Sequence, residues 1–312
     1  MSDARHTPVL AVETQDCLAP GPGKRFIDGT FGFGGHASAL LDAGAEVLGL
    51  DLSADACTAC AALRESQPRL HCRCGSFRHL DRWAAEAGWT AVDGILLDLG
   101  VSSLQLDDPD LGFSYRKDGP LDLRFDQTRG QSAADLVAAL DERDLADLIW
   151  KYGEERGSRR IARRVIAARA VEPVATTTAL REIVERVVPR GRKIEPVLSR
   201  VFQALRIAVN DELGALEEAL TKSPALLAPG GVLAVIGYHS LEDRLVKKFL
   251  ARETRDCLCP PEAMVCTCGH QASLEPISRK AIQASAEEQQ RNPRSRSARL
   301  RAARKLKKGS RT

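Results

Sequence analysis

Short apolar runs alternate with helical stretches along the first part of the chain, and this alternation restricts the fold more than any other feature. The runs, bounded by turn residues, predict buried strands at residues 25–28, 46–51, 70–74, 94–99 and 232–238. Helical stretches at residues 36–43 and 54–65 separate the first three runs. Strands that alternate with helices pair in parallel, so the sequence predicts a doubly wound α/β sheet.

A long insertion interrupts this alternation. More than 130 residues separate the fourth predicted strand from the fifth, where one crossover helix would suffice. The insertion begins with turn residues and continues with helical periodicity at residues 133–152, 158–170 and 177–188. We therefore expect a small helical domain at residues 106–198 between two parts of the core, 1–105 and 199–290. A helix over residues 200–222 is expected to return to the core.

Basic residues are concentrated at the carboxyl end of the chain. Residues 291–312 contain ten Lys and Arg and no acid, whereas the first 290 residues hold 35 basic and 42 acidic side chains. Because this tail has almost no apolar material, we expect a basic flexible segment that contacts nucleic-acid phosphates. The alternative is a solvated segment without a ligand.

The start of the chain and its apolar content favour a cytoplasmic protein without a membrane partner. No run approaches about eighteen consecutive apolar residues, and the first ten residues carry charge and Pro8. In that compartment the nine cysteines are expected to be reduced thiols or metal ligands rather than a disulfide framework. Five of them are expected to fill the core: Cys17, Cys57, Cys60, Cys72 and Cys74.

The other four cysteines form two pairs, Cys257-x-Cys259 and Cys266-x-Cys268. Four thiols are enough in number for tetrahedral zinc, but a one-residue spacer is less usual than spacers of two to four. We favour a reduced, cysteine-rich loop with no metal, and zinc is the alternative.

A glycine-rich segment at residues 28–36, Asp-Gly-Thr-Phe-Gly-Phe-Gly-Gly-His, lies between the first predicted strand and the first helix. Glycines there let the backbone approach a ligand, and helix amides point at an anion. Gly32-x-Gly34-x-x-Ala37 also fits the dinucleotide fingerprint, so NAD or FAD competes as cofactor. The glycine pattern begins three residues beyond the strand, and this spacing favours the methyl donor S-adenosylmethionine.

Residues at the ends of the next three strands complete the predicted site. Asp51 ends the second strand, where a carboxylate accepts hydrogen bonds from ribose hydroxyls. Phe77 follows the third strand, where its ring can cover adenine or fill the core. Asp98 at the edge of the fourth strand can accept the hydrogens of an exocyclic amine, which helps the nitrogen become tetrahedral and attack a methyl group. The sequence therefore predicts methylation of an amine.

Several motifs resemble the bacterial 16S rRNA (cytosine-N4-)-methyltransferase family. They span nearly the whole chain and are highly specific. They lie at residues 28–36, 94–103 (Gly-Ile-Leu-Leu-Asp-Leu-Gly-Val-Ser-Ser), 105–107, 112–114, 119–122, 128–133, 152–156, 202–206, 239–244 and 292–297.

The resemblance implies a class I (Rossmann-like) methyltransferase sheet with an inserted helical domain for substrate recognition. It also implies N4 methylation by S-adenosylmethionine of one cytosine in the decoding centre of 16S rRNA, in the small ribosomal subunit. Asp98 is the candidate catalytic residue, and Gln105 is identified by the resemblance alone. The implied cofactor contacts are Gly34, Gly35, His36, Asp51, Phe77, Asp98 and Gln105. An NAD-dependent dehydrogenase and a non-catalytic RNA-binding or assembly protein are the alternatives.

The chain departs from the family pattern at residues 195–200, Glu-Pro-Val-Leu-Ser-Arg, where the family has a histidine-led segment that is one residue shorter. Residues 99–101, Leu-Gly-Val, stand where many amino-methylating DNA enzymes carry Pro-Pro-aromatic. The base must therefore stack on another ring, and the candidates are Phe31, Phe33, Phe113 and Tyr238. His239 is expected to bond the substrate, or else Ser240 caps a helix there, because no Gly-x-Ser-x-Gly turn supports a hydrolase.

Overall fold

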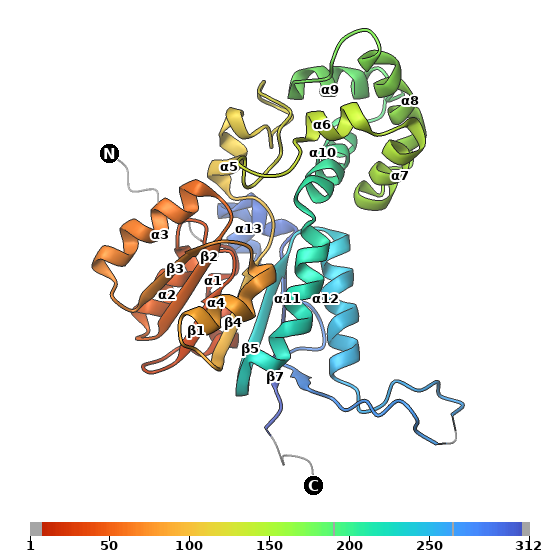
Figure 1. Cartoon of the computed structure of the whole chain (residues 1–312). Helices are drawn as coiled ribbons and strands as arrows, with labels where there is room; N and C mark the ends of the chain where they lie inside the picture. Colours follow the sequence, from red (N-terminus) through yellow and green to blue (C-terminus); the bar gives the residue numbers. More distant parts are fainter. Residues whose placement is uncertain (1–7, 190, 264, 308–312) are drawn as a thin grey trace. The chain divides into compact units, whose positions relative to one another are not determined.

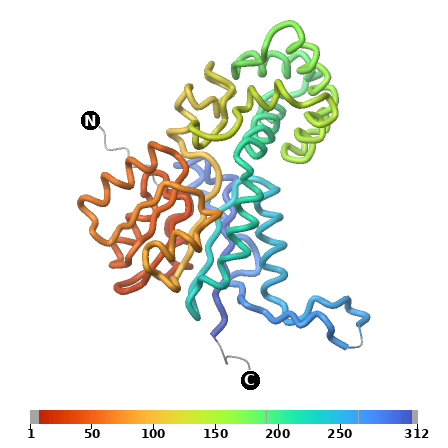
Figure 2. The backbone as a smooth tube through the Cα atoms, in the orientation of Figure 1, coloured from red at the N-terminus to blue at the C-terminus, as the bar shows by residue number. Residues whose placement is uncertain are grey.

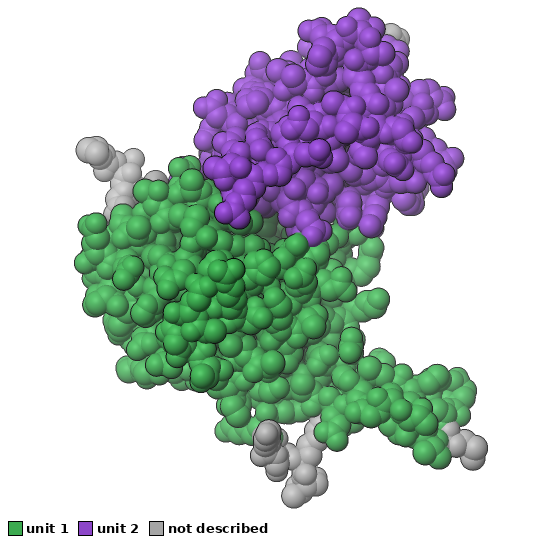
Figure 3. Space-filling view, in the orientation of Figure 1, with its two compact units in different colours: residues 1–100, 213–312 green, residues 101–212 purple. Residues whose placement is uncertain are grey.

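The chain divides into two compact units (Figure 3) in a computed structural model that describes residues 8–189, 191–263 and 265–307. The first unit comprises Met1–Gly100 with Leu213–Thr312, and the second comprises Val101–Glu212. The second unit is longer than the predicted insertion because α10 (Glu195–Asn210) packs on α7 (Glu142–Gly153). Asp211, with φ of 47°, separates α10 from α11 (Glu212–Leu226), so the single helix expected at 200–222 is wrong.

A seven-stranded sheet forms the centre of the first unit, in the order β3-β2-β1-β4-β5-β7-β6 (Figure 1). Its five parallel strands are β1 (Arg25–Asp28), β2 (Glu46–Asp51), β3 (Leu70–Cys74), β4 (Val92–Asp98) and β5 (Leu227–Gly237). The predicted doubly wound α/β fold is confirmed. The strand order reverses between β1 and β4, which is where such sheets open a crevice for ligands.

Helices cover both faces of this sheet because successive strand residues point to opposite sides. Phe26 and Val47 belong to one buried cluster, and their neighbours Ile27 and Leu48 belong to the other. The first face carries α1 (Ala11–Leu18), α2 (Gly35–Asp42) and α3 (Ala54–Ser66), and the second carries α4 (Leu80–Glu86), α11 and α12 (Ser240–Glu253). In the described part of the chain, each helix is too short or too polar to span a bilayer.

The second unit is helical and has its own apolar core. Its elements are α5 (Ser103–Asp107), η2 (Pro109–Leu111), α6 (Ala133–Ala139), α7, α8 (Ser158–Arg169), α9 (Thr177–Glu185) and α10. The helix predicted at 133–152 is two helices, because Asp141 accepts the N–H of Asp144 and caps α7. In the segment that departs from the family pattern, Arg200 Nη1 lies 3.0 Å from Oε2 of the buried Glu155.

The expectation of a flexible tail is wrong for residues 291–307. Residues 286–296 form α13 (Ala286–Arg291) and η3 (Pro293–Arg296), and β7 (Arg299–Lys305) then pairs antiparallel with β5 and with β6 (Leu274–Pro276). Leu300 is fully buried, and Arg301 makes two hydrogen bonds to Asp243 of α12, at 2.8 and 3.2 Å. The tail's charges therefore partly neutralise acids of the body. Residues 308–312 lie outside the described residues.

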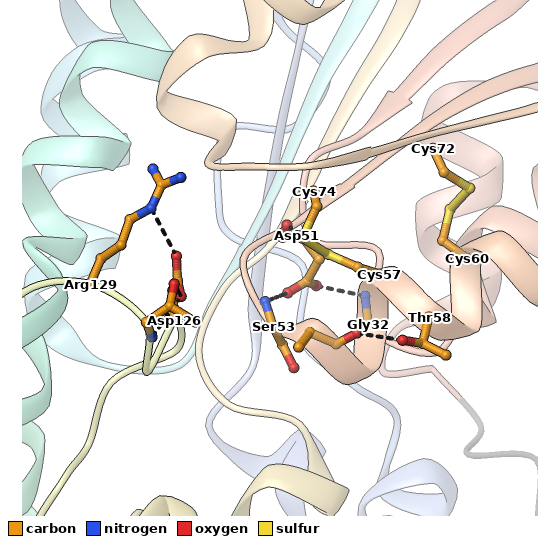
Figure 4. The surroundings of a disulfide bond; sticks show 12 residues. Gly32, Asp51, Ser53, Cys57, Thr58, Cys60, Cys72, Cys74, Asp126 and Arg129 are labelled. Atoms are coloured by element: carbon orange, nitrogen blue, oxygen red, sulfur yellow. Dashed lines mark hydrogen bonds and ion pairs between the residues drawn. A yellow bond between two sulfur atoms is a disulfide. The ribbon is translucent and has the colours of Figure 1, made fainter.

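Two disulfides join α3 to β3, which corrects the expectation of reduced core thiols (Figure 4). Cys57 bonds Cys74 and Cys60 bonds Cys72, with Cα atoms 5.4 and 5.9 Å apart. The helix presents its two cysteines one turn apart and the strand presents its two on one face, so antiparallel packing of helix on strand brings both pairs together. Cys17 is buried and free, as expected.

Candidate functional site

The glycine-rich segment forms the turn between β1 and α2. Gly34 has φ of +79°, and a Cβ there would lie 2.9 Å from the ring of Phe31, so both conformation and space require glycine. The N–H of Gly29 donates to the carbonyl of Leu96 at 2.9 Å and ties the turn to β4. Among the described residues, no side chain caps α2, which begins at Gly35. Its first backbone N–H groups are therefore available to an anionic ligand group.

Asp51, at the end of β2, connects this turn with the start of α3. Its Oδ2 accepts the N–H of Gly32 at 2.8 Å, and its Oδ1 accepts the N–H of Ser53 at 2.9 Å (Figure 4). Burial raises the pKa of Asp51, and the backbone N–H groups of Ser53, Gly32 and Leu52 oppose that rise. The structure thus brings Asp51 and the glycine turn together.

A pocket of about 490 Å³ lies on the α3 side of Asp51. Its wall includes Phe31 and the four disulfide cysteines, but not Gly34, His36 or Asp98. The pocket therefore reaches only the Asp51 part of the predicted site, and Asp98 lies outside it.

Asp98 ends β4 among polar side chains from three other segments. Its N–H donates to Thr30 Oγ1 at 2.6 Å, and its Oδ1 accepts the hydroxyl of Tyr238 at 2.7 Å. Burial, followed by the charge of Asp98, raises the pKa of Tyr238, so the phenol stays protonated and acts as the donor. The Asp98 side chain is 22% exposed, which leaves the carboxylate accessible.

His36, in the first turn of α2, faces the other oxygen of this carboxylate. Its Nε2 lies 3.6 Å from Asp98 Oδ2, an ion-pair distance rather than a hydrogen bond, and Nε2 has no hydrogen-bond partner among the described residues. Burial lowers the pKa of His36, but Asp98 and Asp28 outweigh it and the net shift is upward. The two carboxylates therefore favour the protonated form of His36.

Asp28, at the end of β1, is the most buried acid of this group, with 1% of its surface exposed. Its Oδ1 accepts the N–H of Thr30 at 3.2 Å. Burial raises the pKa of Asp28 to about 6, although His36 and this N–H oppose the rise. The folded protein therefore binds this proton more tightly than the unfolded chain does.

Asp28→Asn is expected to change how stability depends on pH. A folded-state pKa above the unfolded value contributes stability below about pH 4, and this contribution is lost as pH rises through about 6. The asparagine cannot ionise and keeps the acceptor for Thr30. The free energy of unfolding of the variant minus that of the wild type should therefore fall by about 2 kcal/mol from pH 8 to pH 4. Urea titrations at both pH values measure this difference in the free energy of unfolding, and the exposed Asp42→Asn is the control. The same difference at pH 8 and pH 4 for Asp28→Asn would contradict the assignment of Asp28 as a buried acid of raised pKa.

Phe77 begins η1 (Phe77–His79) directly beyond β3. Its Cβ lies 3.0 Å from the position of a Cβ on Gly29, and its partly buried ring packs against the second core cluster. The structure thus places Phe77 beside the glycine turn, in contact with the core.

Gln105 belongs to the second unit, in α5. Its Oε1 accepts the N–H of Ser102 at 2.9 Å, and its own N–H donates to Ser102 Oγ at 3.2 Å. This reciprocal pair is a capping box, so the side chain has a local structural role.

The four candidate stacking rings lie in different environments. Phe31 is 3% exposed and packs against Gly49, and Phe113 is 6% exposed in the core of the second unit. Both are core residues, so the structure does not support them as stacking partners. Phe33 is 43% exposed, and Tyr238 is half-buried at Asp98.

Glu242, which was not predicted, holds the backbone at Tyr238 in place. Its buried Oε2 accepts the N–H of Tyr238 at 2.8 Å and that of His239 at 3.2 Å. His239, rather than Ser240, is the N-cap of α12, and the spacing His-x-x-Glu at the start of a helix was the available signal. Thr30 was also missed, because a threonine inside a glycine-rich turn carries no distinct signal.

Sequence comparison identifies close relatives. The model of the MraW methylase family matches residues 3–306. A protein named Ribosomal RNA small subunit methyltransferase H from Thermomicrobium roseum is 50% identical, with 96% of this chain and 94% of that protein covered. A protein of the same name from Syntrophotalea carbinolica is 48% identical, with 97% and 98% covered. A solved rRNA methylase from Streptococcus thermophilus is 11% identical, with 95% of each chain covered and a TM-score of 0.44.

Proposed function

Because the chain belongs to the MraW methylase family, we propose that it methylates the N4 amino group of cytidine 1402 in the decoding centre of 16S rRNA. Two relatives that match it almost end to end are named as rRNA small subunit methyltransferases, which supports rRNA of the small subunit as substrate. The enzyme then acts in the cytoplasm, where that subunit is found. Membership of a methylase family argues against the dehydrogenase alternative.

S-adenosylmethionine is the cofactor, and the residues around the glycine turn fit it. Asp51 would accept the ribose hydroxyls, since carboxylate oxygens that already take one N–H each retain further lone pairs. The uncapped first turn of α2, at Gly34, Gly35 and His36, would hold the methionine carboxylate. Phe77 would cover the adenine from its position beside Gly29. The bound cofactor supplies an electrophilic methyl carbon.

The observation that carries the proposal is the accessible, oriented carboxylate of Asp98 at the edge of the sheet. The cytosine N4 lone pair is delocalised into the ring, so the nitrogen must become tetrahedral before it attacks the methyl carbon. Asp98 would accept an N4 hydrogen and favour that change, while Tyr238 holds the carboxylate in place. N4 would take the methyl group that the cofactor supplies, the electrons of the former methyl bond would stay on the cofactor sulfur, and the amine proton would leave to water.

The direct test is to map N4-methylcytidine in 16S rRNA from a strain that lacks this gene. We expect the modification at cytidine 1402 to disappear, and to return when the wild-type chain is supplied. Mass spectrometry of the decoding-centre fragment measures both results. Unchanged methylation in the deletion strain, or recovery at another nucleotide, would overturn the proposed target.

Asp51→Asn is expected to weaken S-adenosylmethionine binding about tenfold to a hundredfold. One charged acceptor is lost, and a hydrogen bond to a charged group contributes about 1.5–3 kcal/mol. We prefer Asn to Ala because Asp51 also holds Gly32 and Ser53, and an amide oxygen retains one of these bonds. Calorimetry measures the affinity, and the exposed Asp55→Asn on α3 is the matched control. Equal affinity in the two variants would move the ribose site away from Asp51.

A further inference from the structure

In the segment that connects α12 with β6, residues 254–273, the described residues form no apolar core. We call this segment the cysteine arm. It extends beyond the end of α12 (Figure 1, Figure 2), and none of its described residues is buried. Leu258 is 40% exposed and Val265 is 73% exposed. An irregular segment of this length is unusual in a compact domain unless something other than apolar packing holds it.

The base of the cysteine arm is fixed by hydrogen bonds. The N–H of Ser273 donates to the carbonyl of Glu253 at 2.9 Å, and the Ser273 hydroxyl donates to the carboxylate of Glu253 at 2.6 Å. His270 Nε2 also lies 2.9 Å from the carbonyl oxygen of Arg252, so these contacts close the arm at the end of α12. The cysteines of the arm lie further along the chain, beyond this base.

Four free cysteines converge at that point: Cys257, Cys259, Cys266 and Cys268. All of their Sγ atoms lie within 4.8 Å of one another. Cys257 Sγ lies 3.4 Å from that of Cys266 and 3.8 Å from that of Cys268, and the last two are 3.6 Å apart. Four sulfurs around a zinc ion at about 2.3 Å are separated by about 3.8 Å. The thiols are thus spaced for tetrahedral coordination.

We propose that these four thiolates bind one structural Zn²⁺ ion that holds the cysteine arm together. The four protein ligands complete the coordination shell, which is the arrangement of structural rather than catalytic zinc. The proposal is independent of the methyl-transfer reaction, because no residue of the proposed active site takes part.

Backbone N–H groups around the cluster point at the sulfurs. Cys268 Sγ accepts the N–H of Leu258 at 3.3 Å, and Cys259 Sγ accepts the N–H of Thr267 at 3.4 Å. Cys257 Sγ accepts the N–H of Cys259 at 3.4 Å. Such donors stabilise thiolate charge and orient the ligands of a metal. The first two of these bonds join one CxC pair to the other, so the two halves of the arm are already in register for a shared ion.

The main alternative is a pair of disulfides within the cluster. The four cysteines on α3 and β3 are bonded in the structure, whereas these four are free although each sulfur has several neighbours. One sulfur surrounded by more than one partner suits a shared ion, while a disulfide requires exclusive pairs. This difference is what the experiment distinguishes.

The test is the metal content of the full chain, purified without chelator and measured by plasma mass spectrometry. We expect about one zinc per chain, lost in Cys257→Ser and in Cys268→Ser. Cys17→Ser, which removes a buried thiol outside the cluster, should retain it. Metal-stripped wild-type protein titrated with Co²⁺ should develop the visible absorption of tetrahedral thiolate coordination, a readout that does not depend on the variants folding.

Proteolysis gives a structural readout, because Glu262 lies between the two CxC pairs. Cleavage there by a glutamate-specific protease should become at least about tenfold faster after zinc removal, since a metal-held loop opens only when the site is lost. Wild-type protein with little zinc and no tetrahedral Co²⁺ spectrum would overturn the proposal. Disulfides among the four cysteines, found by peptide mapping, would also overturn it.

Discussion

Deletion of residues 299–312 is expected to prevent the first unit from folding, because it removes β7 from inside the sheet. β7 pairs with β5 along six residues and with β6 along three. Leu300 and Ala302 pack in one core cluster and Ala303 in the other, so the strand contributes to both faces. Its loss exposes the backbone edge of β5 and the apolar side chains next to it. Soluble yield and the loss of a cooperative urea transition measure the effect.

Three further variants separate the contribution of the strand from that of its charge. Deleting residues 308–312 removes Lys308 and Arg311 but leaves β7, and should preserve the transition. In the full chain, Leu300→Ala should lower the free energy of unfolding by about 2–5 kcal/mol, as expected for a buried leucine. The exposed Arg296→Ala should change it by less than about 0.5 kcal/mol. A chain that lacks 299–312 but retains native unfolding and cofactor affinity would restore the flexible-arm interpretation.

β7 shows why a composition-based prediction can be wrong about structure. In Arg299-Leu-Arg-Ala-Ala-Arg-Lys305 the buried positions are mainly alanines, which provide little hydrophobic signal beside four charges. The charges do not prevent burial, because Arg301 is held by Asp243 on a helix remote in sequence. The parallel strands could be predicted because each is a short apolar run in a repeating pattern. A strand of low hydrophobicity that pairs between β5 and β6 and depends on a distant acid could not.

The disulfides carried a signal that we did not use. Cys57 and Cys60 lie one helical turn apart, and Cys72 and Cys74 lie on one face of a strand. The two spacings match if the helix packs antiparallel on the strand. The cysteine pairs can be assigned, however, only when α3 is known to cover β3. A reducing compartment favours free thiols, but the packing of α3 on β3 brings these four cysteines within bonding distance.

The site could be predicted in outline but not in its contacts. The glycine turn, Asp51 and Asp98 follow strands, so fold topology alone places them along one edge of the sheet. The bonds from Thr30 and Tyr238 to Asp98 join segments far apart in the chain, and no local pattern encodes them. These contacts fix the orientation of the carboxylate, which is what its proposed chemistry needs.

Asp98→Asn is expected to lower turnover about a hundredfold at saturating S-adenosylmethionine. The amide oxygen can still accept the hydroxyl of Tyr238, so the side chain should keep its place. The new NH₂ replaces Oδ2, the oxygen that faces His36, and presents a donor to the donor N4 of the proposed cytosine substrate. An interaction that strengthens in the transition state is lost, and a hundredfold corresponds to about 2.7 kcal/mol, within what one such contact provides.

Turnover and affinity must be separated, because Asp98 also lies beside the proposed cofactor site. Single-turnover methylation of small-subunit particles should show the defect in the rate constant, with a smaller change in the Michaelis constant for RNA. Tyr238→Phe keeps the carboxylate but removes its hydroxyl donor, so it should reduce turnover less than Asp98→Asn does. A defect that excess cofactor repairs would make Asp98 a binding residue only. Wild-type turnover in Asp98→Asn would exclude it as the acceptor for the amine.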